Sequence, residues 1–380
     1  MYICPLCGTK DSKYFGINKG KIYCRRCVTF QGAEIPYEKK YNFEKVEEKL
    51  NYPLSKEQEE ISNKILRAYI EGKNILLHAV CGAGKTELTY KVIAHCLSSC
   101  LQVGFAIPRR DVVVELLPRL QEAFPSKKVV AVYGGNTSSL QGDIILLTTH
   151  QLYRYKNYFD LLIIDETDAF PFSGNELLND LFFRSLRGTY LMMSATPLPY
   201  MEQSIKESNG VYLKLMRRYH NHPLIVPRCE ITSFIPFFIL LKYMNKFIKN
   251  HKPLFIFVPT IEEGEILLKK VKMFYKNGEF VSSKTKERSA IISSFKNGEL
   301  SYLITTSILE RGVTVKDLQV IVYHADHELY DEGTLIQISG RVGRKIDAYD
   351  GEVIFIASRK TKKMESAIRK IENANEQEGL

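Results

Sequence analysis

Short apolar runs without polar alternation recur between residues 74 and 358, and they constrain the fold more than any other feature. Continuous Val, Ile and Leu indicate strands buried on both faces, as in a parallel sheet covered by helices. The first set is NILLHAV (74–80), LQVGFAIP (101–108), VVAVYGG (129–135), DIILLTT (143–149), DLLIIDET (160–167) and YLMMSAT (190–196). After the polar stretch 201–210, the second set is PLFIFVPT (253–260), EFVSS (279–283), SYLITTS (301–307), LQVIVYH (318–324) and GEVIFIAS (351–358). Helical segments separate these runs, so we expect an α/β protein with two tandem domains on parallel sheets.

Length and charge limit the number of domains and the kind of partner that this chain can have. The chain has 380 residues, of which 45% are hydrophobic, enough for two or three domain cores. Its net charge of +10 fits an anionic partner such as nucleic acid or an acidic membrane surface. The start is polar, unlike a secretory signal, and the apolar run FIPFFILL from Phe234 is far shorter than the ~20 residues of a membrane span. We therefore expect a cytoplasmic protein with no membrane span.

The segment AVCGAGKT, residues 79–86, lies directly after a predicted strand and before a predicted helix. This is the context of a phosphate-binding loop, in which Gly82 and Gly84 let backbone N–H groups face the phosphates of ATP. Lys85 would reach the β and γ oxygens, and the Thr86 hydroxyl would bind Mg²⁺. The commoner pattern has glycine where this chain has Ala79. The form A-x-x-G-x-G-K-T, used by superfamily 2 helicases, matches every position.

Carboxylates follow another buried strand, in the order Asp165, Glu166, Thr167, Asp168. They emerge at the carboxyl end of that strand, where α/β sheets place ligands. Asp165 can hold Mg²⁺, and Glu166 can orient the attacking water as a general base. The segment SATP, residues 194–197, ends the next strand, and its small hydroxyls could couple the nucleotide site to motion.

The second domain carries the segment QISGRVGR, residues 337–344. If this segment is helical, Gln337, Arg341 and Arg344 share one face. Arginines at these positions could stabilise charge on a γ-phosphate.

The motifs AVCGAGKT, DETD, SATP and QISGRVGR together resemble a superfamily 2 helicase or translocase with two RecA-like domains, over residues 52–360. This resemblance implies that ATP binds between the domains and that closure and opening step the protein along a nucleic-acid strand. It also implies strand-contacting motifs at IPRR (107–110), YGG (133–135), TTHQL (148–152), FVPT (257–260) and TSILERGVT (306–314). Arg109 and Arg110, with the hydroxyls of Thr148 and Thr149, are suitable phosphate ligands.

Gln58 allows two interpretations. The family often places a glutamine upstream of the phosphate loop to read adenine. Ser55 and Gln58 also match a helix capping box, in which the glutamine serves only the start of the helix. The sequence leaves both roles open.

Four of the eight cysteines lie within the first 27 residues, as the pairs Cys4, Cys7 and Cys24, Cys27. Two C-x-x-C pairs at this spacing are typical of a four-cysteine Zn²⁺ site, and the segment between them can form a hairpin that joins the pairs. Such a small module lacks a core, so the metal would hold it folded. Its basic and aromatic residues suit nucleic-acid contact, and docking to another protein is the alternative.

A zinc ribbon ahead of a compact helicase core is similar to the ComFA family of late-competence proteins, with the motifs CPLC, CRRC and RRYHNHPL in the same order. This resemblance implies an ATP-dependent translocase that draws single-stranded DNA into the cytoplasm during uptake. It implies the membrane channel ComEC and the protein ComFC as partners, and peripheral association with the inner face of the membrane through them. We expect a zinc module at 1–35, a linker at 36–52, and RecA-like domains at 53–205 and 206–380.

Two alternatives remain at this stage. The replication-restart helicase PriA shares related motifs, but it carries its zinc cysteines within the helicase core. The other alternative is a non-catalytic nucleic-acid-binding scaffold on a relic ATP fold. The presence of Lys85, Thr86, Asp165, Glu166 and both arginines counts against a relic.

Overall fold

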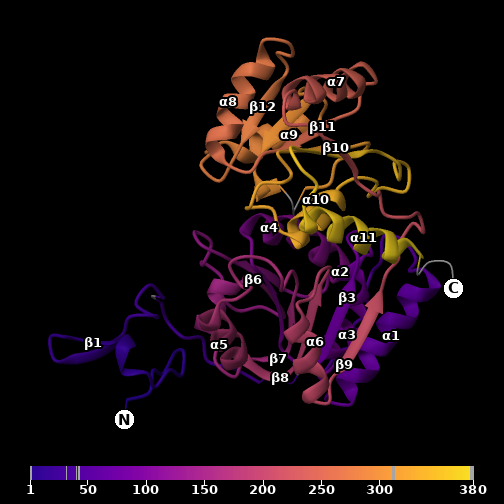
Figure 1. The fold of residues 1–380 in the computed structure, drawn as a ribbon. Helices are drawn as coiled ribbons and strands as arrows, with labels where there is room; N and C mark the ends of the chain where they lie inside the picture. Colours follow the sequence, from indigo (N-terminus) through magenta and orange to yellow (C-terminus); the bar gives the residue numbers. More distant parts are fainter. Residues whose placement is uncertain (1, 31, 40, 42, 310–312, 377–380) are drawn as a thin grey trace. The chain divides into compact units, whose positions relative to one another are not determined.

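The computed structural model describes residues 2–30, 32–39, 41, 43–309 and 313–376. The chain forms two compact units, Met1–Ala79 with Gly84–Leu215, and Val80–Ala83 with Met216–Leu380. Each unit is an α/β layer structure (Figure 1). Among the described residues, no helix combines the length and the apolar character needed to cross a membrane.

The described part of the first unit contains a parallel sheet of seven strands in the order β5-β6-β4-β7-β8-β3-β9. The strands are β3 (Ile75–Ala79), β4 (Val103–Ile107), β5 (Val129–Val132), β6 (Ile144–Thr148), β7 (Phe159–Ile164), β8 (Leu186–Ser194) and β9 (Val211–Leu215). All six apolar runs predicted for this unit are strands, and β4, β6 and β7 are buried along their whole length. The doubly covered parallel sheet is therefore confirmed.

Helices of the first unit connect these strands. They are α1 (Lys56–Ile70), α2 (Lys85–Leu88), α3 (Tyr90–Ser98), α4 (Arg110–Ala123), α5 (Glu176–Ser185) and α6 (Pro199–Glu207), with the 3-10 helix η2 (Thr149–Arg154). The polar stretch at 201–210, which we expected to separate the domains, is largely α6. The expected boundary after residue 205 precedes β9, a strand that pairs with β3 in this sheet.

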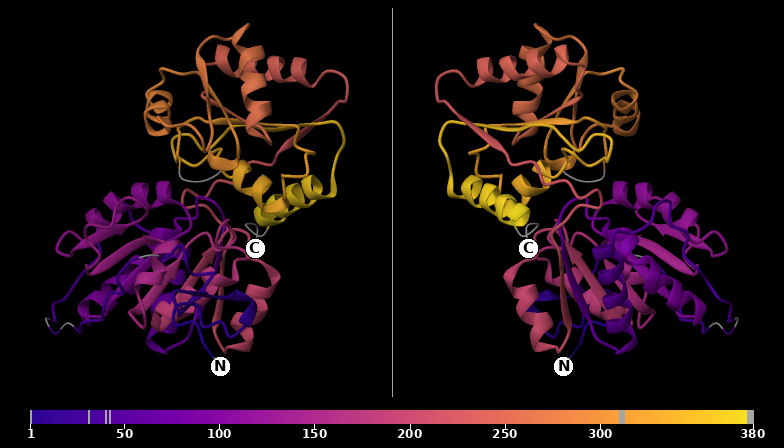
Figure 2. Two further views of the ribbon diagram at one scale, coloured as in Figure 1. Left: turned by 90° about the vertical axis from the view of Figure 1, so that its left-hand side faces the viewer. Right: turned by 90° about the vertical axis from the view of Figure 1, so that its right-hand side faces the viewer.

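The described part of the second unit contains a parallel sheet of six strands in the order β10-β15-β14-β11-β13-β12. The strands are β10 (Arg228–Ile231), β11 (Leu254–Phe257), β12 (Gly278–Val281), β13 (Tyr302–Thr305), β14 (Gln319–Tyr323) and β15 (Val353–Ala357). The helices are α7 (Pro236–Lys249), α8 (Ile261–Lys272), α9 (Arg288–Lys296), α10 (Glu332–Ser339) and α11 (Lys362–Glu376), with the 3-10 helix η3 (Ser307–Leu309). Figure 2 shows these helices around the sheet from two further directions. All five apolar runs predicted here are strands.

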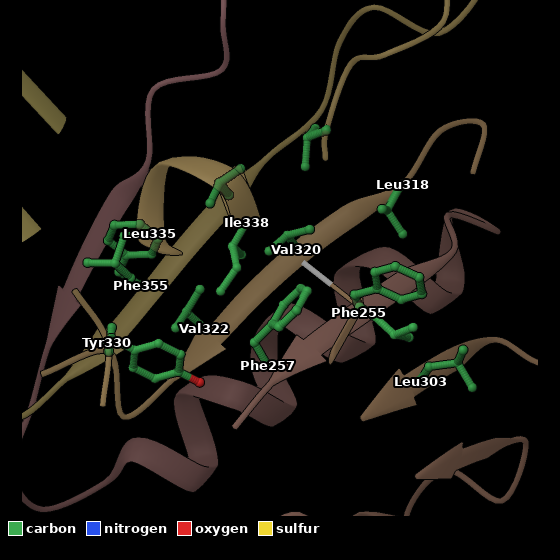
Figure 3. Close-up of a cluster of buried hydrophobic side chains, with 14 of the residues drawn as sticks. Phe255, Phe257, Leu303, Leu318, Val320, Val322, Tyr330, Leu335, Ile338 and Phe355 are labelled. Carbon is green, nitrogen blue, oxygen red and sulfur yellow. The ribbon is translucent and has the colours of Figure 1, made fainter. Parts of the chain in front are cut away.

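One face of this second sheet carries the core that anchors α10. Phe255 and Phe257 of β11 and Val320 and Val322 of β14 point toward α10 and its neighbours, and all four are fully buried. Leu335 and Ile338 of α10 face this cluster and have no exposed surface (Figure 3). Burial of two such side chains stabilises the packing by about 3–6 kcal/mol. The position of α10 on the sheet is therefore fixed by its apolar side.

The amino-terminal residues form a small module with a 3-10 helix η1 (Ser12–Tyr14) and an antiparallel hairpin of β1 (Phe15–Asn18) and β2 (Lys21–Cys24). Lys19 and Gly20 form the hairpin turn with positive φ of 47° and 78°. Two positive φ values in a two-residue loop match the twist of the flanking strands. The hairpin predicted between the two cysteine pairs is therefore present.

Candidate nucleotide and zinc sites

The predicted phosphate loop connects β3 to α2. Gly82 and Gly84 have φ of 85° and 74°, and Gly84 is the residue directly before α2. Residues with a side chain rarely adopt this left-handed conformation, so the loop requires glycine at both positions. Lys85 and Thr86 follow as the first two residues of α2. The local structure therefore has the backbone form expected of a loop that faces phosphates.

Lys85 and Asp165 come together at the carboxyl end of the sheet. Asp165 directly follows β7, and Lys85 follows β3 after the loop, with only β8 between the two strands. Lys85 Nζ lies 4.0 Å from Asp165 Oδ1, and both side chains are about 15% exposed. A lysine and a carboxylate this close can bind a metal-bound triphosphate together, the lysine through the phosphates and the carboxylate through the metal ion. The structure thus brings together two residues that the sequence placed 80 positions apart.

Glu166 has an unusual backbone conformation. Its φ is 60°, which is uncommon for a residue with a long side chain, and its N–H donates to Asp165 Oδ1 at 2.8 Å. Strained backbone of this kind persists where the surroundings hold it, often at functional sites. The Glu166 side chain is half-buried at the same edge of the sheet.

Asp168 links the acidic segment to the SATP segment. Ser194 Oγ donates to Asp168 Oδ1 at 2.6 Å, and Thr196 Oγ1 donates to Asp168 Oδ2 at 2.9 Å. Thr196 N–H also donates to Ser194 Oγ at 2.9 Å. Each carboxylate oxygen therefore holds one hydroxyl from the end of β8. The sequence indicated both the hydroxyls and the acidic segment that contains Asp168, but not the hydrogen bonds between them.

His78 is a further residue that the sequence analysis missed. It lies in β3, one position before Ala79, with Nε2 3.1 Å from the Ala195 carbonyl oxygen and Nδ1 3.1 Å from the Tyr212 hydroxyl. Burial lowers the pKa of His78 to about 4, with Lys214 and Lys85 acting in the same direction. The imidazole is therefore neutral near pH 7. A histidine inside the apolar run NILLHAV was the available sequence signal.

Gln58 lies at the start of α1 and is buried. The capping box is present, because Ser55 N–H donates to Gln58 Oε1 at 2.9 Å and Gln58 N–H donates to Ser55 Oγ at 3.2 Å. A Cβ atom built on Gly84 would lie only 2.6 Å from Gln58 Nε2. The amide therefore lies against the phosphate loop while it caps the helix. Capping is thus observed, and adenine contact stays a prediction.

The arginines of the second unit do not lie on a helix, so the helical interpretation of residues 340–344 is wrong. Helix α10 ends at Ser339, and Gly343 has a positive φ of 68°. We call residues 340–344 the arginine turn. Arg341 is buried and donates to the Val313 carbonyl at 2.8 Å, and Arg344 Nε donates to the Gly340 carbonyl at 2.8 Å. Gln337 lies within α10 and is also buried.

The predicted strand-contacting residues differ in exposure. Arg109 immediately precedes α4, and Arg110, its first residue, is exposed and packs over the Tyr133 ring at 4.9 Å. Thr148 and Thr149 are buried, so their hydroxyls would reach a phosphate only after a local change of the chain. Tyr133 belongs to the predicted YGG motif. Residues 310–312 of the predicted motif TSILERGVT lie outside the described residues.

The four amino-terminal cysteines converge. Their Sγ atoms all lie within 4.8 Å of one another, with 3.8 Å between Cys4 and Cys27 and 3.9 Å between Cys7 and Cys24. Four thiolates around a tetrahedral Zn²⁺ with bonds of about 2.3 Å have sulfur–sulfur distances of about 3.8 Å. The geometry therefore fits zinc. Tyr14 and Phe15 pack against this cluster, so these two aromatic rings serve the module itself.

The module is attached to the first RecA-like unit through α5 and η2. Arg26 lies 3.5 Å from Asp180, and Arg184 donates to the Pro5 carbonyl at 3.2 Å and forms an ion pair with Glu34. The Phe30 ring lies 5.2 Å from the Tyr153 ring. These contacts place the module beside α5 (Figure 1).

Comparisons with known proteins agree with this fold and site. Residues 51–198 match the family described as type III restriction enzyme, res subunit, and residues 239–345 match the helicase conserved C-terminal domain. The structure of S. cerevisiae Dbp5 bound to RNA and ADP BeF3 superposes with a TM-score of 0.64 at 17% identity, covering 84% of this chain and 91% of that chain. DEAD-box helicase Mss116 bound to ssRNA and UDP-BeF gives a TM-score of 0.65 at 17% identity, covering 84% and 78%. The fold and the site together define a helicase-like ATPase of superfamily 2 with two RecA-like domains.

Relatives that match almost the whole chain identify the family within this class of ATPases. The chain is 34% identical to competence protein ComFA of Bacillus subtilis over 399 residues, covering 99% of this chain and 86% of that protein. It is 34% identical to ComFA of Streptococcus pneumoniae over 394 residues, covering 99% and 91%. The chain belongs to the ComFA family of competence proteins. This membership favours the ComFA interpretation over the PriA-like alternative.

Proposed function

We propose that this protein uses ATP hydrolysis to move along single-stranded DNA and so drives the uptake of transforming DNA into the cytoplasm. The approach of Lys85 to Asp165 at the carboxyl end of the first sheet carries the ATPase part of this proposal. Family membership supports the role in competence.

The chemistry follows from the side chains at the strand ends. Lys85 would neutralise charge on the β- and γ-phosphates, and Thr86 with Asp165 would hold Mg²⁺. Mg²⁺ supplies further neutralisation of the phosphate oxygens when it is bound. Glu166 would orient the attacking water as a general base.

The second unit would contribute positive charge. Arg341 and Arg344 would stabilise the transferring phosphoryl group, with Gln337 nearby on the preceding helix. Their contribution would depend on where the two guanidinium groups lie.

Coupling of hydrolysis to movement would run through Asp168. Its carboxylate joins the acidic segment after β7 to the hydroxyls at the end of β8. A change at Asp165 or Glu166 on hydrolysis would be passed to Ser194 and Thr196 through these two hydrogen bonds. This supports a motor in preference to a static binding protein.

DNA would be held through its phosphates. Arg109 and Arg110, with Thr148 and Thr149, are the proposed contacts, and the net charge of +10 favours any polyanion. Arg110 is the most accessible of these four side chains. The channel ComEC and the protein ComFC are the proposed partners at the inner face of the membrane.

The four amino-terminal cysteines are the proposed ligands of a Zn²⁺ ion.

The test is steady-state ATP hydrolysis with no polymer, single-stranded DNA, duplex DNA and RNA, for the wild type and Lys85→Ala. We expect strong stimulation by single-stranded DNA and loss of activity in the variant. Lys45→Ala is the matched control, because this lysine is 84% exposed and pairs with the exposed Glu47. If ATP is not hydrolysed under any of these four conditions, the result would support the non-catalytic binding scaffold instead.

A further inference from the structure

The segment RRYHNH, residues 217–222, follows β9 and has no role in the chemistry above. Two of its side chains are deeply buried in the second unit. Arg218 is 2% exposed and His220 is 7% exposed. A buried arginine is costly unless its donors are used, so the acceptors of Arg218 show what the segment does.

Both side chains donate to the arginine turn. Arg218 Nη1 donates to the Val342 carbonyl at 2.9 Å and to the Gly343 carbonyl at 2.5 Å. His220 Nε2 lies 2.9 Å from the same Gly343 carbonyl. His220 Nδ1 accepts from the His222 N–H at 3.2 Å, so the neutral tautomer with its proton on Nε2 satisfies both contacts.

The other side of the turn is also closely packed. A Cβ atom on Gly343 would lie 2.3 Å from the Tyr349 carbonyl oxygen, so backbone approaches backbone there. The His222 ring stacks on the Tyr349 ring, with centroids 3.5 Å apart and planes 4° from parallel. The turn is thus held between the segment 218–222 and the segment around Tyr349.

We infer that Arg218 and His220 are positioning residues for the arginine turn, and that they set the geometry with which Arg341 and Arg344 act. This inference rests on the proposed role of those two arginines in hydrolysis. The N–H groups of Gly340, Arg341 and Val342 still donate to the carbonyls of Ile336, Ile338 and Ser339, so the backbone fixes the start of the turn. At its far end, the carbonyls of Val342 and Gly343 accept three hydrogen bonds from the buried donors of Arg218 and His220, which add a second constraint.

Chain connectivity gives these contacts a second consequence. Only Met216 and Arg217 separate Arg218 from the end of β9, and β9 pairs with β3, the strand that leads into the phosphate loop. The segment that holds the arginine turn is therefore tied along the chain to the sheet that carries Lys85.

The test compares Arg218→Met, His220→Phe and His220→Gln with the wild type. Two measurements are made on each: hydrogen–deuterium exchange of peptides covering residues 337–349, and kcat and KM for ATP with single-stranded DNA. We expect faster exchange in the turn and a ~10- to 100-fold fall in kcat for Arg218→Met and His220→Phe, with KM nearly unchanged. His220→Gln keeps a donor and should retain most of the activity.

The control is Arg359→Met, the same exchange at an exposed arginine of the second unit. Unchanged exchange in residues 340–344 of both Arg218→Met and His220→Phe would overturn the inference, as would full kcat despite a loosened turn. If Arg218→Met does not fold, the two His220 variants decide the question through the Gly343 carbonyl. A wild type without ATPase activity would refute the proposed function, while exchange would still show whether the turn is held.

Discussion

The Ser194 hydroxyl donates a hydrogen bond of 2.6 Å to the Asp168 carboxylate, which joins the ends of two neighbouring strands of the first sheet. The second oxygen of the same carboxylate accepts from Thr196. Because a carboxylate accepts strongly, each bond contributes more than a neutral hydrogen bond would. The two bonds therefore tie the segment that follows β7 to the end of β8.

Ser194→Ala and Thr196→Val each remove one of these bonds. We expect each to destabilise the protein by about 1.5–3 kcal/mol and to reduce the stimulation of ATPase activity by single-stranded DNA more than the basal rate. Urea unfolding and ATPase assays measure both effects. Ser208→Ala is the control, because its hydroxyl donates to a backbone carbonyl, that of Ile205 at the end of α6. Equal loss of basal and stimulated rates would contradict a coupling role.

His78 makes the free energy of unfolding depend on pH. Its pKa of about 4 in the folded protein lies below the ordinary value of 6.5, so the unfolded chain takes up this proton first as the pH falls. The free energy of unfolding therefore decreases on acidification, by about 2 kcal/mol between pH 7 and pH 5 from this group. Urea unfolding of wild type and His78→Gln at both pH values isolates the contribution. An identical loss in the variant would assign the effect to other groups.

Gln58 and Ser55 form a matched pair for separating helix capping from adenine recognition. Ser55→Ala and Gln58→Ala each remove one half of the capping box and should each cost about 1 kcal/mol of stability. Only Gln58→Ala should lower the preference for ATP over GTP, by ~10-fold for the loss of a buried hydrogen bond. The ratio of KM values for the two nucleotides measures this. The same ratio in both variants would leave Gln58 with capping alone.

Zinc removal should unfold the amino-terminal module. We expect a strong chelator to release one Zn²⁺ per chain, to make Cys4, Cys7, Cys24 and Cys27 titratable, and to open residues 1–35 to proteolysis. Cys7→Ser should have the same effect without chelator, whereas Cys229→Ser, in the second unit, should not. Freshly purified protein that contains no zinc, with all four thiols already reactive, would refute the site.

Most of both sheets could be predicted because their central strands are buried on both faces and read as unbroken apolar runs. The two strands that the sequence analysis missed, β9 and β10, lie at sheet edges. Their sequences VYLKL and RCEI mix polar and apolar residues, and only one neighbour covers each strand. The other two edge strands, β5 and β12, were predicted, so the mixed composition of β9 and β10, and not edge position alone, removed the signal on which the prediction depended.

Some residues of the candidate site could also be predicted from the sequence, and others could not. Lys85 and Asp165 could be placed together because each follows a buried parallel strand, and such strands present their carboxyl ends at one edge. The helical interpretation of the arginine turn failed because Gly343 takes a left-handed conformation that ends helical geometry. Asp168, His78 and Arg218 act through partners distant in the sequence, and no local pattern specifies such pairs.

Arg184 contacts segments that are made at very different times during synthesis. It donates to the carbonyl of Pro5, 179 positions earlier in the chain, and to the carbonyls of Tyr153 and Tyr155. At ribosomal rates, α5 is complete roughly 10–35 seconds after the first cysteine pair. The cysteine module therefore emerges long before its docking surface exists, and if it binds Zn²⁺ as proposed, metal capture by the nascent chain would hold it in shape until α5 is made.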